Sequence, residues 1–174
     1  MGRLMSQTWK RVKRMNKNDA MHRRAVILGG SAGLVLVSTM PLSAQNRTIW
    51  SAAEAYDALQ SDTLRLIDVR SRAEWSETGV AEGAWPISLH EDNFGPRLFA
   101  AKERAGDRTV GLMCAVGGRS GAVFANLLSI GQSTGFVDVS EGMMGSSLGP
   151  GWIAGGFPVV SAETALAGLP AELL

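Results

Sequence analysis

Short apolar runs alternate with segments of helical periodicity along this chain from residue 48 onward. The apolar runs are rich in β-forming side chains and are bounded by polar or turn residues, which is typical of buried strands. We expect strands at residues 64–69, 84–89, 109–113 and 136–139, and helices at residues 51–59, 94–104 and 120–130. Because strands separated by helices favour a parallel sheet, the alternation predicts one α/β domain with a mostly parallel central sheet flanked by helices.

Local signals support several of these boundaries. Ser51 followed by Glu54 has the capping-box pattern of a helix start, and Gly131 is a typical residue just past a helix end. Asp68 lies near the end of one predicted strand, and Cys114 directly follows another. Since ligand sites of open α/β sheets form at the carboxyl ends of the strands, we expect Asp68 and Cys114 to lie at one functional edge.

The first 44 residues have the organisation of an export signal. They hold eight Lys or Arg and one acid, with an uncharged, mostly apolar run at residues 25–40 before a small-residue segment. We therefore place an export signal at residues 1–44, with cleavage near Ala44. The apolar run is shorter than the roughly 20 residues that span a bilayer, so we expect removal rather than a stable anchor. Arg23 and Arg24 leave the twin-arginine and the ordinary secretory routes both open. The sequence predicts a periplasmic or otherwise exported protein that meets the membrane only during export.

The rest of the chain is acidic, with fifteen Asp or Glu against nine Lys or Arg. Because nucleic-acid binding needs clustered basic residues on the folded part, we expect no nucleic-acid partner. Cys114 is the only cysteine, and His90 is the only histidine after the export signal. This composition excludes a disulfide within the chain and a metal site built from Cys and His, and we expect no metal and no cofactor.

The segment that begins at Cys114 has the composition of an anion-binding loop. A thiol reacts as its thiolate, and backbone N–H groups at a helix N-terminus stabilise such an anion. Gly117 and Gly118 can turn successive N–H groups toward one point, and we expect Ser120 to cap the following helix. Arg119 adds a permanent charge whose donors suit an oxyanion. The pattern predicts a reactive cysteine rather than a core cysteine.

Four residues of this loop resemble, in order and spacing, the active-site pattern of the rhodanese family: Cys114, Gly117, Arg119 and Ser120. Segments similar to the other signatures of that family follow in the expected order at residues 66–75, 83–87, 141–142 and 151–159. The resemblance implies a single rhodanese-like domain at residues 48–162, followed by a short C-terminal tail at residues 163–174.

The resemblance also implies a sulfurtransferase, which moves sulfane sulfur from a donor such as thiosulfate to a thiol or cyanide acceptor, or to a sulfur-accepting protein. Cys114 would carry the sulfur as a persulfide. The N–H groups of the loop would stabilise the persulfide, and its arginine would orient the donor. The loop consists of Ala115, Val116, Gly117, Gly118, Arg119 and Ser120. Asp68 and Arg70 would support the site, as a structural pair in preference to direct substrate contacts.

The alternatives to a sulfurtransferase are a non-enzymatic module and a different class of enzyme. A non-catalytic rhodanese-like module for binding or redox sensing stays open, since Cys114 could oxidise with a thiol of another protein. The chain departs from the family pattern at Val80, where histidine is common, and at Ala115, where active members often carry a basic or aromatic residue. A cysteine phosphatase or arsenate reductase is disfavoured, because its loop has one residue more between cysteine and arginine than the four found here.

A few side chains outside the loop complete these expectations. Glu74 is a candidate partner for Arg70. His90 is expected on a surface loop, with nothing near it that indicates a ligand or a general base. Three aromatic residues are expected to pack in the core: Trp85, Trp152 and Phe157.

Overall fold

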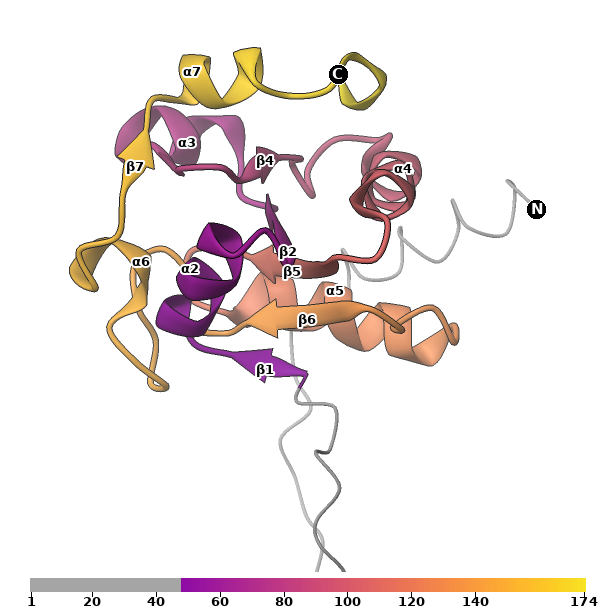
Figure 1. Ribbon diagram of the computed structural model, residues 1–174, viewed down its shortest axis with the longest axis horizontal. Coiled ribbons are helices and arrows are strands. Elements are labelled where there is room, and N and C mark those ends of the chain that lie inside the picture. The colour runs from indigo at the N-terminus through magenta and orange to yellow at the C-terminus, as the bar shows by residue number, and fades with distance from the viewer. Residues whose placement is uncertain (1–47) are drawn as a thin grey trace, which may run out of the picture.

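The computed structural model describes residues 48–174, and the predicted export signal at residues 1–44 lies outside the described residues. Its centre is a five-stranded sheet in the order β1-β6-β5-β2-β4, in which every neighbouring pair is parallel (Figure 1). These strands are β1 (Ile49–Trp50), β2 (Leu64–Asp68), β4 (Trp85–Pro86), β5 (Thr109–Met113) and β6 (Phe136–Val139). Two short strands, β3 (Val80–Ala81) and β7 (Val159–Val160), form a separate antiparallel pair. The predicted α/β fold with a mostly parallel sheet is confirmed.

Helices cover both faces of the sheet. They are α2 (Ala52–Gln60), α3 (Arg72–Thr78), α4 (Phe94–Ala105), α5 (Gly118–Ser129), α6 (Gly151–Ala154) and α7 (Ala162–Ala167), with a final 3-10 turn η1 (Ala171–Leu173). Side chains alternate along a strand, so Ile67 and Leu112 join the apolar cluster under α4 and α5, whereas Leu66 and Met113 join the cluster under α2, α3 and α6. Both clusters are buried, and the sheet therefore has two covered faces, as parallel sheets generally do.

Most of the predicted element boundaries agree with the structure. The capping box at the start of α2 is present, with the Glu54 N–H donating to Ser51 Oγ at 3.1 Å. The predicted strands at residues 109–113 and 136–139 have the observed bounds. The predicted strand at residues 84–89 is too long, because its partner β2 ends at Asp68 and only two residues pair with it. Within residues 48–174, no helix combines the length and the apolar character needed to cross a membrane.

The C-terminal residues are folded against the domain. Leu169 and Leu173 are buried in the cluster that contains α4. Arg97 of α4 donates from Nε to the backbone oxygen of Leu173 at 2.7 Å, and Arg104 pairs with Glu172 at 2.6 Å. The residues predicted as a short tail, 163–174, thus contact α4 near both of its ends.

Candidate active site

Cys114 directly follows β5 at the carboxyl end of the sheet, and its side chain is buried. Its backbone oxygen accepts a hydrogen bond from Met143 N–H at 2.9 Å, and the backbone oxygen of Ala115 accepts one from Met144 N–H at 2.8 Å. Gly142 allows this contact, since a Cβ at that position would lie 2.5 Å from the Ala115 oxygen and its φ is +69°. The segment after β6 therefore holds the backbone at Cys114 and Ala115 in place.

The loop after Cys114 turns directly into α5. Gly117 is the N-cap residue, with a left-handed backbone at φ 83°, and a Cβ there would lie 2.1 Å from the backbone oxygen of Ser140. Only glycine fits this turn without strain. The first N–H groups of a helix have no partner within the helix, and those of α5 begin immediately after the loop. An anion at the mouth of the loop would meet these donors and the positive end of the helix dipole.

Ser120 does not cap α5, contrary to the expectation from the sequence. It lies inside the first turn, three residues after the Gly117 N-cap, because the left-handed turn that opens this helix requires glycine. The Ser120 side chain is buried, and its hydroxyl donates to Cys114 Sγ at 3.5 Å and to the Gly117 backbone oxygen at 3.2 Å. The serine hydroxyl therefore donates a hydrogen bond to the cysteine sulfur instead of capping the helix.

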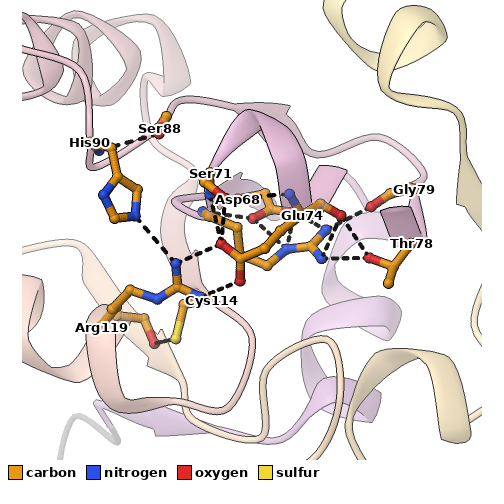
Figure 2. A network of polar contacts seen from close by, with 11 residues as sticks. Asp68, Ser71, Glu74, Thr78, Gly79, Ser88, His90, Cys114 and Arg119 are labelled. Carbon is orange, nitrogen blue, oxygen red and sulfur yellow. Dashed lines mark hydrogen bonds and ion pairs between the residues drawn. The ribbon is translucent and has the colours of Figure 1, made fainter. Parts of the chain in front are cut away.

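Arg119 is held by a carboxylate rather than left open to solvent. Its Nη2 lies 2.5 Å from Glu74 Oε1 and its Nη1 lies 2.7 Å from Glu74 Oε2, as Figure 2 shows. The hydrogen bond from Arg119 lowers the pKa of Glu74 to about 2, with burial opposing the shift and the Ser71 N–H and hydroxyl adding to it. The hydrogen bond to Glu74 raises the pKa of Arg119. A bidentate pair of this kind fixes the guanidinium in one orientation.

The expected pairing of Glu74 with Arg70 is wrong. Glu74 is the fourth residue of a capping box that starts α3, with Ser71 N–H and Ser71 Oγ donating to its Oε2, and this turns the carboxylate toward Arg119. Only the backbone oxygen of Glu74 approaches Arg70, at 3.5 Å. Arg70 instead pairs with Asp68, from Nη2 to Oδ2 at 2.7 Å, and both side chains are at most 1% exposed.

The Asp68–Arg70 pair ties the end of β2 to the helix that follows it. Beyond its bonds to the carboxylate, Arg70 donates from Nη1 to Thr78 Oγ1 at 2.7 Å and from Nη2 to the Gly79 backbone oxygen at 2.6 Å. The Arg70 N–H also donates to Asp68 Oδ1 at 3.0 Å. Both charges are thus satisfied by protein groups, which is the structural pairing expected from the sequence.

Two side chains that the sequence did not assign to this site, His90 and Asp138, lie close to it in the structure. His90 is exposed on a turn, as expected, but its Nε2 lies 3.4 Å from Arg119 Nη1 (Figure 2). Asp138 near the end of β6 lies beside Ser120 and was not identified from the sequence. The rule that selected Asp68, an acid at the end of an apolar strand, also applies to Asp138. Trp85 and Trp152 are buried in the core as expected, and Phe157 is partly buried against Trp152.

Replacing Glu74 with glutamine tests the pair through its pH dependence. Glutamine keeps the capping box but removes the charge. Since the folded-state pKa of Glu74 lies near 2, below its ordinary value of 4.5, the carboxylate stabilises the fold above pH 4.5, and this contribution is lost as the pH falls through about 2. For this partly exposed pair we expect up to about 1 kcal/mol at neutral pH. Urea unfolding of both proteins between neutral and strongly acidic pH measures it. A difference in unfolding free energy that stays constant over this range would contradict the assignment.

Comparison with known proteins places this site in a family. The family model for the rhodanese-like domain matches residues 51–146. The solved structures include a rhodanese-related protein from Thermoplasma volcanium, 24% identical, with the match covering 66% of this chain and 97% of that chain at a TM-score of 0.45. No curated protein matches the chain.

Among residues 48–174, no group of three or more His, Cys, Asp or Glu is arranged to hold a metal ion.

Proposed function

The chain belongs to the rhodanese-like domain family, and from this premise we propose that it is a sulfurtransferase that carries sulfane sulfur as a persulfide on Cys114. One observation supports the proposal most directly. Cys114 Sγ lies at the start of α5 and accepts a hydrogen bond from Ser120 Oγ at 3.5 Å. A sulfur anion in this position meets a side-chain donor and a helix N-terminus at once, which are two common ways of stabilising a thiolate.

The proposed reaction is a double displacement. The Cys114 thiolate attacks the outer sulfur of thiosulfate, a new S–S bond forms, and the S–S bond of thiosulfate breaks with its electron pair leaving on sulfite. An acceptor such as cyanide then attacks the outer sulfur of the persulfide, and thiocyanate leaves as the electron pair returns to Cys114. Both steps are covalent catalysis without a cofactor, because no net oxidation or proton transfer is required.

Arg119 is the cation we propose for orienting the donor. Its two outer nitrogens each donate one hydrogen bond to Glu74. A sulfonate group would therefore bind the other N–H donors of the guanidinium, together with the N–H groups at the start of the helix. The negative charge of Glu74 reduces the attraction for a dianion such as thiosulfate. We therefore propose that a thiol-based persulfide, with less charge near the reacting sulfur, is an equal or better donor, and that the acceptor is a thiol or a sulfur-accepting protein.

The non-catalytic module remains the second candidate, and two observations favour it. The Cys114 side chain is only 1% exposed, and the residue after it is Ala115, which supplies no charge. A binding or redox-sensing module would use the same loop without turnover. For the cell compartment, we propose export, on the basis of the basic and apolar pattern of residues 1–44.

Steady-state kinetics with thiosulfate and cyanide test the enzyme against the module. We expect a ping-pong pattern, with parallel double-reciprocal lines, because sulfite leaves before cyanide enters. Arg119→Ala is expected to lower kcat/KM for thiosulfate about 10²-fold, since it removes a preorganised donor and leaves Glu74 unpaired.

A surface arginine supplies the matched control. Arg104 pairs with Glu172, with both side chains about half exposed, and Arg104→Ala should leave kcat/KM unchanged. No turnover by the unaltered protein with thiosulfate or an organic persulfide would favour the module, and equal effects of the two arginine variants would reject the role of Arg119.

A further inference from the structure

His90 lies at the mouth of the cysteine loop, and the double displacement does not use it. It is exposed on the turn after β4, and its ring points toward Arg119, with imidazole Nε2 3.4 Å from guanidinium Nη1 (Figure 2). It is the only histidine within residues 48–174. Histidine is the side chain whose charge ordinarily changes between about pH 5 and 8. The arginine of the loop therefore has a neighbour whose charge can change near neutral pH.

Backbone hydrogen bonds fix the turn that carries His90. The N–H groups of Ile87 and Leu89 donate to the last residue of β2 and to the residue after it, at 3.0 and 3.1 Å. The His90 N–H donates to Ser88 Oγ at 3.2 Å. These bonds hold the turn at the carboxyl end of the sheet, where Cys114 also lies.

The contact between His90 and Arg119 requires a neutral imidazole. A guanidinium has only N–H donors and does not lose its charge in proteins, so Arg119 Nη1 donates and His90 Nε2 accepts. The ring proton is then on Nδ1. An imidazolium has no acceptor nitrogen. Protonation of His90 would therefore break this hydrogen bond and set two cations side by side.

The other charged groups around the turn are carboxylates and guanidinium groups, which ordinarily titrate outside the range between about pH 5 and 8. They are Glu91 and Asp92 on the turn itself, Arg72 and Glu74 on α3, Arg97 on α4 and Arg119 on α5. Glu91 pairs with both Arg72 and Arg97. At the mouth, the charge of Arg119 is balanced by that of Glu74, so a protonated His90 would give the mouth a net positive charge.

We propose that His90 is a specificity-determining residue whose charge determines how strongly the site attracts an anionic sulfur donor. With a neutral imidazole, Arg119 is shared between His90 and Glu74, and the mouth has no net charge. With an imidazolium, the added positive charge attracts a dianion such as thiosulfate, whereas an uncharged donor gains nothing. The identity of the anion as a sulfur donor rests on the proposed function, but the attraction for an anion does not.

Two alkylating reagents that differ in charge test this inference without any sulfur transfer. Iodoacetate is an anion and iodoacetamide is neutral, and both react with the Cys114 thiolate. The ratio of their second-order rate constants cancels the ionisation of the cysteine and measures the attraction of an anion to the mouth. We expect the iodoacetate-to-iodoacetamide ratio to rise about two- to fivefold as the pH falls from about 8 to about 5.5, the effect of one added charge at a partly exposed site.

Two substitutions at the exposed position 90 show whether the imidazole charge causes the rise. His90→Gln does not titrate, and its amide oxygen can still accept from Arg119, so its ratio should stay at the value that the unaltered protein has at the higher pH. His90→Lys is charged throughout and should keep the high ratio at both pH values. A ratio that still rises in His90→Gln, or that does not change in the unaltered protein, would overturn the inference.

The control returns a histidine to the His90→Gln protein at a distance from the site. Gln132 is exposed just beyond α5, a helix of 12 residues that is about 18 Å long. Exposed charges are largely screened beyond about 8 Å at about 0.15 M salt. Adding Gln132→His should therefore leave the ratio independent of pH. A restored rise would show that the ratio follows the net charge of the protein rather than His90 and would also overturn the inference.

Failure of the inference and failure of the proposed function give different results. Sulfur transfer together with an alkylation ratio that is independent of pH would reject the role of His90 alone. The predicted ratios without turnover of any sulfane donor would support the role of His90 in attracting anions and reject the sulfurtransferase.

Discussion

Cys114→Ser is expected to abolish sulfur transfer, with a loss of at least about 10⁴-fold in kcat for thiosulfate and cyanide. The hydroxyl of serine is a far weaker nucleophile toward sulfur at neutral pH and cannot form a persulfide. Steady-state assays of both proteins under identical conditions measure the effect. No other cysteine can substitute, because the sequence contains only this one.

The fold should survive this substitution. Serine is nearly isosteric with cysteine, and the new hydroxyl can accept the hydrogen bond that Ser120 now donates to Cys114 Sγ. Urea unfolding should therefore show a change of only about 1 kcal/mol, typical of a small polar change at a buried site. Turnover by a well-folded Cys114→Ser protein at more than a tenth of the original rate would reject the persulfide mechanism.

Arg70→Met is expected to destabilise the fold by about 3–5 kcal/mol, the cost of removing one partner of a buried ion pair. Methionine preserves much of the volume, but Asp68 would remain fully buried without its cation, and Thr78 Oγ1 and the Gly79 oxygen would lose their donor. Total domain stabilities are about 5–15 kcal/mol, so this is a large share. Urea unfolding at neutral pH measures the loss.

A control variant and a double variant show whether the loss of stability comes from the buried ion pair. Arg104→Met removes an exposed partner of Glu172 and should cost no more than about 1 kcal/mol. Asp68→Asn added to Arg70→Met should recover part of the lost stability, because it removes the unpaired charge. A cost below about 1 kcal/mol for Arg70→Met would show that the buried pair does not support the fold.

The architecture could be predicted because hydrophobic periodicity follows from the geometry of strands and helices. The runs at residues 109–113 and 136–139 carry apolar side chains on both faces, with Asp138 the charged exception, and both faces are covered in the structure. The strand predicted at residues 84–89 was too long, since strand length depends on the partner and β2 ends at Asp68. The helix start expected at Ser120 was wrong, because the left-handed turn at Gly117 already begins α5.

The location of the cysteine loop could be predicted, but its electrostatic partners could not. Glu74 lies 45 residues from Arg119 in the sequence, and only the capping box of α3 turns its carboxylate toward the arginine. Asp138 lies on β6, and β6 lies beside β5, the strand before Cys114, only because of the strand order in the sheet. Pairings of this kind are long-range and set by topology, so a local pattern contains no signal for them beyond the residue type.

The central claim, that Cys114 carries sulfur, is tested most directly by intact mass spectrometry of the purified protein. The chain should gain the mass of one sulfur atom after treatment with thiosulfate or an organic persulfide, and lose it again on addition of cyanide or a thiol. Cys114→Ser should gain nothing under the same conditions. An unchanged mass with every sulfane donor, or the same gain in Cys114→Ser, would contradict a persulfide at Cys114.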